Sequence, residues 1–356
     1  MLGNWISDAS APLIMPSHSF HVSAFAAVSV ARLDHASASP HLQTKPDFRI
    51  TQALLPTPVL ALALACLPSH AAPTPISVPV KNLVLDLDAS VGVESDSQER
   101  VLSWTNRVHG FPAQKFVPND KGRKVPGSGI PSLLKAEGDR KFPAVLFRQQ
   151  ELINDQEDAF DALIQGKGHT WYAVVAVYDQ TSVRKNTHAI FGNLRNSTAA
   201  GGGTGGNYEG FWGVMHNDRR VYAGVRNGIN FERNGPNNPE VLSRTTLEKF
   251  RYYVVAGRMG AGSGTVAVEV FVNRPVAENA STVPVNPKAD PSRMAIGQER
   301  DATNHPGDES FDGELARLII YDRAHDAAEM AATFETLIKH YGIKVTAPDL
   351  KTDPAK

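Results

Sequence analysis

Residues 311–329, FDGELARLIIYDRAHDAAE, decide the fold because the hydrophobic pattern changes partway along them. Residues 315–321 (LARLIIY) have the apolar, β-branched composition of a buried strand. Asp326 and Glu329 then have the spacing of a capping box at a helix N-terminus. Apolar residues recur downstream at helical spacing, and Gly342 follows as a stop signal. We therefore predict a strand followed directly by a C-terminal helix.

The apolar side chains of this strand do not fit a single alternating pattern. Leu315, Leu318 and Ile320 are not in one register with Ile319, although positions two apart in a regular strand share a face. We expect one set to face a core between two sheets and the other set to be covered by the terminal helix.

The sequence upstream contains about ten apolar or β-branched runs separated by turn signals. Helical patterns do not alternate with these runs, which argues against a parallel α/β sheet. One short helix is predicted within residues 155–163, with Glu157, Asp158 and Asp161 on one face. The predicted fold is all-β: an antiparallel two-sheet jelly-roll sandwich with a short C-terminal helix.

The N-terminal region resembles a secretory leader. Residues 50–67 are mostly apolar, follow Lys45 and Arg49, and precede a small-residue cleavage pattern that ends at Ala71. The alternative is a membrane anchor, but the unbroken apolar run 59–67 is far shorter than the roughly 20 residues that span a bilayer. We expect residues 1–71 to be an upstream leader and signal peptide cleaved after Ala71, with the true translation start near residue 42.

Composition excludes several classes of protein. The net charge of −1 gives no field that favours nucleic acid. The single cysteine, Cys66, lies within the predicted leader, so the mature chain is predicted to have neither disulfides nor thiolate chemistry. We expect a secreted, periplasmic or cell-surface protein with no membrane span in the mature chain.

The ending FDGELARLIIYDRAHDAAE, followed by LIKHYGI, resembles the C-terminal strand and helix of laminin-G-like domains in the concanavalin A-like lectin/glucanase superfamily. The segments LVLDLDAS, VLSWTNR, FPAVLF and AIGQERDATNHPGDESF are similar to that group as well. The resemblance covers residues 82–343, between a proline-rich linker at 72–81 and a disordered tail at 344–356. It implies a jelly-roll scaffold whose activity depends on residues added to its loops and faces.

The aromatic strand NYEGFWGVMH is the candidate ligand site, because sugar rings stack on aromatic planes while their hydroxyls bind planar polar groups. If Trp212 points outward, we expect Phe211 and Val214 to point to the core; the alternative is a core position for Trp212. The predicted ligand-binding residues are Tyr208, Trp212, His216, Arg226 and Asn230.

The acidic loop at residues 301–309 is a candidate calcium site because hard cations prefer oxygen ligands. A flexible polar turn explains the same composition. The predicted calcium ligands are Asp301, Asn304, Asp308 and Glu309.

No catalytic residue is assigned. The sequence lacks the close-set strand carboxylates by which glycosidases of the resembled superfamily act, a Gly-x-Ser-x-Gly elbow and a His-Glu-x-x-His zinc motif. We expect Asp312 and Glu314 to be solvated, the alternative being a catalytic or metal-binding role.

The favoured function is a secreted module that binds a carbohydrate or another surface ligand without catalysis. The alternatives are a polysaccharide-degrading hydrolase or lyase of the same superfamily, or a structural, adhesive module that binds protein.

Overall fold

A computed structural model describes residues 77–181, 186–195, 208–229, 235–299 and 307–345. By its backbone contacts the chain divides into residues 1–67 and 68–356, and all the described residues belong to the second unit. Within the described residues, no helix is long and apolar enough to cross a membrane.

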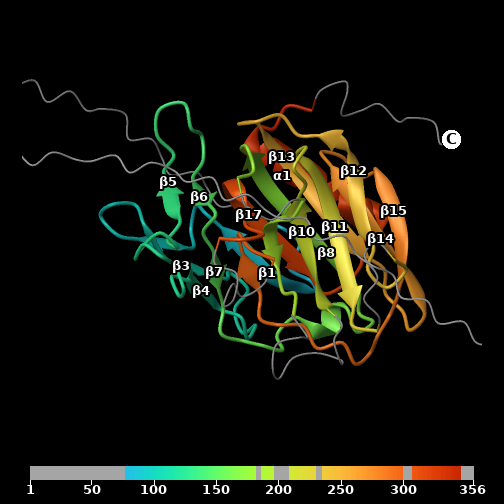
Figure 1. Cartoon of the computed structure of the whole chain (residues 1–356). Coiled ribbons are helices and arrows are strands. Elements are labelled where there is room, and N and C mark those ends of the chain that lie inside the picture. Colours follow the sequence, from blue (N-terminus) through green and yellow to red (C-terminus); the bar gives the residue numbers. More distant parts are fainter. Residues whose placement is uncertain (1–76, 182–185, 196–207, 230–234, 300–306, 346–356) are drawn as a thin grey trace, which may run out of the picture. The chain divides into compact units, whose positions relative to one another are not determined.

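The first sheet has eight strands, all paired in antiparallel fashion (Figure 1). Along the sheet the order is β15 (Asn279–Pro284), β14 (Thr265–Val272), β13 (Tyr252–Met259), β8 (His169–Val177), β17 (Asp312–Tyr321), β6 (Ala144–Arg148) and β5 (Ser132–Leu134), with β1 (Leu83–Asp88) paired to β17.

The second sheet has nine strands, also paired antiparallel. Its order is β12 (Glu240–Thr246), β11 (Arg220–Asn227), β10 (Glu209–Met215), β9 (His188–Gly192), β16 (Ala295–Ile296), β7 (Leu152–Ile153), β4 (Lys115–Pro118), β3 (Val101–Thr105) and β2 (Val93–Ser95). Side chains of both sheets, including Trp171, Phe211 and Leu315, form one buried core between them. The predicted antiparallel sandwich with a short C-terminal helix is confirmed.

The mixed register of β17 has a local cause. Against β8, Leu315 pairs with Val175 and Arg317 pairs with Val174. Strand β17 therefore has one extra residue, Ala316, between two consecutive pairs. This β-bulge lets Leu315, Leu318 and Ile320 all face the core. Ile319, together with Ala316 and Tyr321, lies in a second apolar cluster on the outer face of the eight-stranded sheet. The prediction of two differently covered sets is confirmed.

Helix α1 (Ala327–Tyr341) covers this second cluster. The Asp326 side chain accepts a hydrogen bond from the Glu329 amide, the Glu329 side chain accepts one from the Asp326 amide, and Gly342 ends the helix in the left-handed conformation. The helix buries Met330, Thr333, Phe334, Leu337 and Tyr341. The predicted cap and stop are confirmed. The earlier predicted helix is shorter than expected: only η1 (Asp161–Leu163), a 3-10 turn, forms within residues 155–163.

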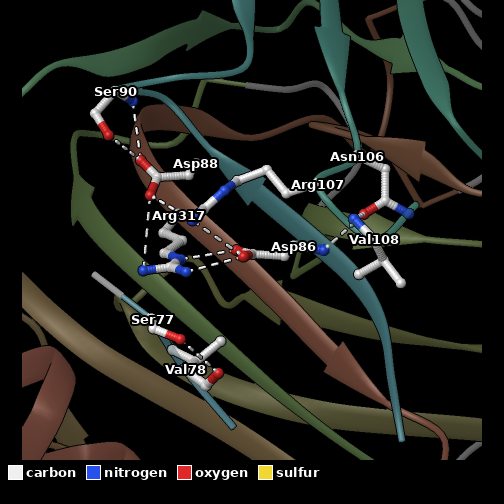
Figure 2. A network of polar contacts seen from close by, with 9 residues as sticks. All are labelled: Ser77, Val78, Asp86, Asp88, Ser90, Asn106, Arg107, Val108 and Arg317. Carbon is white, nitrogen blue, oxygen red and sulfur yellow. Dashed lines mark hydrogen bonds and ion pairs between the residues drawn. The ribbon is translucent and has the colours of Figure 1, made fainter. Parts of the chain in front are cut away.

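An ionic network joins β1 and β17, which are the first and last strands of the eight-stranded sheet in chain order. Figure 2 shows the guanidinium groups of Arg317 and Arg107 converging on the carboxylates of Asp86 and Asp88. Arg317 Nε and Nη2 donate to the two Asp86 oxygens at 2.8 and 2.9 Å, and the Arg317 side chain is fully buried. Ser90 donates its amide and hydroxyl to Asp88 at 2.9 and 2.6 Å. The buried charges are therefore both paired and hydrogen-bonded, as a low-dielectric site requires.

Replacing Arg317 with methionine should reduce the free energy of unfolding by about 3–5 kcal/mol, because Asp86 would keep a buried charge without its bidentate partner. Arg107→Met is the matched control: Arg107 is partly exposed, so its loss should cost about 1 kcal/mol or less. Urea unfolding of both variants checks the difference. Adding Asp86→Asn to Arg317→Met should recover part of the loss; equal losses in the two single variants would contradict this account.

Candidate functional site

The predicted aromatic strand is β10, which lies between β9 and β11 in the nine-stranded sheet. Phe211 and Met215 face the core, whereas Trp212 and Val214 belong to a cluster on the outer face of the sheet. The expectation that Val214 would share the side of Phe211 is wrong, because residues two apart in a strand share a face. This outer-face cluster also includes Ala189, Leu194 and Tyr222.

Arg226 of β11 lies over two aromatic rings of the outer-face cluster. Its guanidinium carbon is 4.9 Å from the Trp212 ring centroid and 5.2 Å from that of Tyr208, within the range of cation–π attraction. Gly224 pairs with Trp212, and a Cβ atom at Gly224 would come within 2.3 Å of the indole. The missing side chain therefore makes room for the indole against the sheet.

A carboxylate completes this arrangement. Glu240 of β12 pairs with Gly224, and its Oε1 is 3.6 Å from Nη2 of Arg226. Both side chains remain slightly exposed, and Tyr208 is half-buried, whereas Trp212 is 0% exposed. The Trp212 ring therefore points away from the inter-sheet core but is closed to a ligand. The surface available for contact consists of Tyr208, Arg226 and Glu240, which we call the Arg226 face.

Of the other two predicted ligand residues, the structure describes only His216. His216 lies in the turn after β10, where its Nδ1 is 2.9 Å from Oδ1 of Asp218 and its amide donates to the Arg220 carbonyl. The described contacts of His216 are with this turn and do not include the Arg226 face. Asn230 lies outside the described residues.

The predicted calcium loop is described only at its end, because Asp301 and Asn304 lie outside the described residues. The Asp308 carbonyl accepts hydrogen bonds from the Gln298 side chain and the Ser310 hydroxyl. The Glu309 carbonyl accepts one from the Ala189 amide at 3.0 Å. These contacts attach the end of the loop to the nine-stranded sheet, and calcium binding there stays a prediction.

Asp158 and Asp161, predicted to share a helix face, lie close to a third carboxylate, that of Asp290. Oxygens of Asp158, Asp161 and Asp290 lie within 4.8 Å of one another. Asp290 is far along the chain from the other two, so local spacing alone did not reveal the group. Burial and the negative charges of Asp158 and Asp290 raise the pKa of Asp161 to about 7, while Arg195 acts in the opposite direction. Oδ1 of Asp161 is buried and has no hydrogen-bond partner among the described residues.

A cavity of about 570 Å³ lies beside the ionic network of Figure 2. Its polar wall is already used by the chain: Asn106 accepts from the Asp86 and Val108 amides and donates to two carbonyls, and Arg107 binds Asp88. We therefore do not place the ligand site there. The lining residues are Ser77, Val78, Val80, Leu83, Asp86, Val91, Gly92, Thr105, Asn106, Arg107, Val108 and His109.

Neither a family model nor a curated protein matches this chain. Among solved structures, domain 4 of the extracellular GH43 arabinanase AbnA of Geobacillus stearothermophilus, in complex with arabinotriose, is 13% identical, with a TM-score of 0.44 over 70% of this chain and 97% of that one. The Trypanosoma rangeli sialidase, in complex with sialic acid, is 16% identical, with a TM-score of 0.44 over 74% of this chain and 34% of the sialidase. A heptameric SAP-like pentraxin of Limulus polyphemus is 16% identical, with a TM-score of 0.31 over 48% of this chain and 70% of the pentraxin. Similarities at this level assign neither a ligand nor an activity to this chain.

The Asp161 carboxyl predicts a pH dependence of stability. Its pKa is raised above the ordinary value of 3.8 to about 7 in the folded protein, so the folded state binds more protons between these values. Its contribution to stability is therefore lost as pH rises from about 4 to 7. Between pH 5 and pH 8, the melting temperature of Asp161→Asn should therefore fall less than that of the wild type.

Thermal unfolding at the two pH values measures this difference. Asp155→Asn, which removes an exposed acid in the same segment, is the control and should behave as the wild type does. A change in melting temperature with pH that is the same in all three proteins would contradict the prediction.

Proposed function

We propose that this protein is a secreted, laminin-G-like carbohydrate-binding module that performs no chemistry of its own and takes its ligand on the Arg226 face. The observation that carries this proposal is the placement of one guanidinium over two aromatic rings with Glu240 beside it. The described helix α1 packs on the other sheet and leaves this outer face uncovered by a helix.

The residues of the Arg226 face have the chemistry that a sugar requires. A guanidinium presents several N–H donors in one plane, and a carboxylate presents acceptors, so together they match vicinal hydroxyl groups. The partly exposed ring of Tyr208 can stack against the C–H face of a pyranose. Because Arg226 is held by its stacking and by Glu240, little side-chain freedom is lost on binding.

The proposal places the protein outside the cytoplasm, following its predicted signal peptide, with a glycan of the cell surface or the surroundings as its partner. We also propose that calcium binds at the loop 301–309, because hard cations prefer the oxygen ligands that this loop offers. The binding test is therefore run both with calcium and with chelator.

The enzymatic alternative has one specific observation in its favour. Glu240 and Glu299 both lie near Tyr222, whose pKa is raised by burial first and then by these two negative charges. A glycosidase needs two carboxylates on opposite sides of the scissile bond. Glu299 is almost fully buried, however, which favours a structural role for it over contact with a polysaccharide.

An oligosaccharide array, probed with the purified protein in calcium and in chelator, tests the proposal. Arg226→Met should weaken binding to the positive glycans about tenfold or more, since a lost charged hydrogen bond is worth about 1.5–3 kcal/mol. Tyr208→Ala should also weaken it. Arg220→Met, on the same strand but paired with Asp218 in the turn, is the matched control and should bind as the wild type does.

The same samples should be assayed for new reducing ends and unsaturated products. Turnover would replace the binding module with the enzymatic alternative. If Arg226→Met leaves binding unchanged, the ligand does not bind on the Arg226 face. If no glycan binds, the proposal is overturned in favour of a protein-binding module.

A further inference from the structure

One end of the outer face of the eight-stranded sheet has a different character from the part beneath α1. Tyr252 of β13 and Glu314 of β17 both pair with Ala176 of β8, so that their side chains lie on one face with the small alanine between them. The next row is formed by Asp312, which pairs with Arg148 of β6, and by Tyr178, whose amide donates to the Asp312 carbonyl.

Glu314 is the centre of the first row and is held by three side chains. It accepts hydrogen bonds from the hydroxyls of Tyr178 and Tyr252 and from two nitrogens of Arg140. Burial alone would raise the pKa of Glu314, but the bonds from Arg140, Tyr178 and Tyr252 keep it below its ordinary value. The expectation of a solvated Glu314 is therefore wrong: the carboxylate is buried and fixed.

Asp312 is also buried, which again corrects the expectation of a solvated side chain. Its Oδ2 accepts from the amide and the hydroxyl of Thr181 at 2.9 and 2.7 Å. Its Oδ1 has no hydrogen-bond partner among the described residues, and the nearest cation is Nε of Arg148 at 3.5 Å.

The two carboxylates are hidden while the two guanidinium groups are not. The side chains of Asp312 and Glu314 are 1% and 7% exposed, whereas those of Arg148 and Arg140 are 48% and 28% exposed. A molecule that reaches this face therefore meets cations first. The Arg148 guanidinium lies 5.2 Å from the ring centroid of Tyr178, and its terminal nitrogens have no hydrogen bond to the described residues.

Phe250 adds an exposed aromatic ring beside these groups. It is 70% exposed, and its ring centroid is 4.8 Å from that of Tyr178. Its backbone is left-handed, with φ of 62°, and its amide donates to the Val177 carbonyl at 3.0 Å. A bulky residue rarely adopts this conformation, and such strain is common where a side chain is held for a ligand. The neighbouring charges are balanced in the pairs Lys249–Asp179 and Arg251–Glu248.

We propose that Phe250, Tyr178 and Arg148 form a second binding site, which takes the carboxylate-bearing sugar unit of an acidic polysaccharide. The pyranose C–H face stacks on Phe250, and the sugar carboxylate binds the terminal nitrogens of Arg148, with Arg140 beside them. A neutral apolar partner would cover the Arg148 guanidinium without pairing its terminal nitrogens, which is unfavourable. A uronic acid offers both a C–H face and an anion to the same side of the molecule.

Calorimetric titration with oligogalacturonate and with oligoglucuronate, in chelator and at low salt, tests this site. We expect both, or one of them, to bind the wild-type protein, and the fully methyl-esterified form to bind at least tenfold more weakly because its carboxylates are neutral. Absence of binding to both uronates overturns the proposal, and so does equal binding of the ester.

Two variants locate the site. Phe250→Gly removes the ring and at the same time relieves the left-handed backbone, so that loss of binding cannot be ascribed to a strained fold. Arg148→Met removes the exposed cation. Each should weaken uronate binding at least tenfold, and Arg148→Lys should give an intermediate loss because it keeps the charge without the planar fork.

Arg220→Met, on the other sheet and outside both proposed sites, is the control and should leave uronate binding unchanged. If uronate binding is lost in Arg226→Met and kept in Phe250→Gly, the ligand lies on the Arg226 face and the second site is overturned. If array glycans bind through Arg226 while uronates do not bind at all, the proposed function stands and this inference alone fails.

Discussion

Strand β17 runs through the middle of the eight-stranded sheet and is buried along all ten of its residues. It pairs with β8 on one side; on the other it pairs with β6 through Leu315 and with β1 from Arg317 onward. The bulge at Ala316 lies where one partner ends and the next begins. This exchange of neighbours coincides with the register shift of β17 against β8. The shift decides which side chains of β17 face the core and which face the helix.

The bulge also separates two kinds of polar group on the outer face of the same sheet. On one side of the bulge, Arg317 is buried in ion pairs with Asp86 and Asp88, which stabilise the fold. On the other side, Glu314 and Asp312 lie beneath partly exposed arginines and aromatic rings. The nine-stranded sheet has a comparable grouping in Arg226, where the aromatic partners are more deeply buried. The two outer faces thus differ mainly in how much of their aromatic surface is open.

Local sequence patterns were sufficient for features that depend on near neighbours. The capping box of Asp326 and Glu329, the stop at Gly342 and the two-sided character of β17 follow from spacing alone and are present in the structure. The burial of Glu314 was not predictable in this way, because its partner Arg140 is 174 positions away in the chain. The grouping of Tyr208, Trp212 and Arg226 could be predicted because it requires only that the adjacent strands β10 and β11 pair. The position of Asp290 beside Asp158 and Asp161 could not, because it depends on contacts between distant parts of the chain.

The Asp86–Arg317 pair joins residues separated by 231 positions. The strand β1 therefore has no partner in its sheet until almost the whole domain has been synthesised, which at about 5–20 residues per second takes on the order of tens of seconds. During that interval the apolar residues of β1 are not paired with or covered by β17. Closing so long a loop also slows the formation of the native strand pairing. A domain connected in this way completes its eight-stranded sheet only after its synthesis is nearly complete.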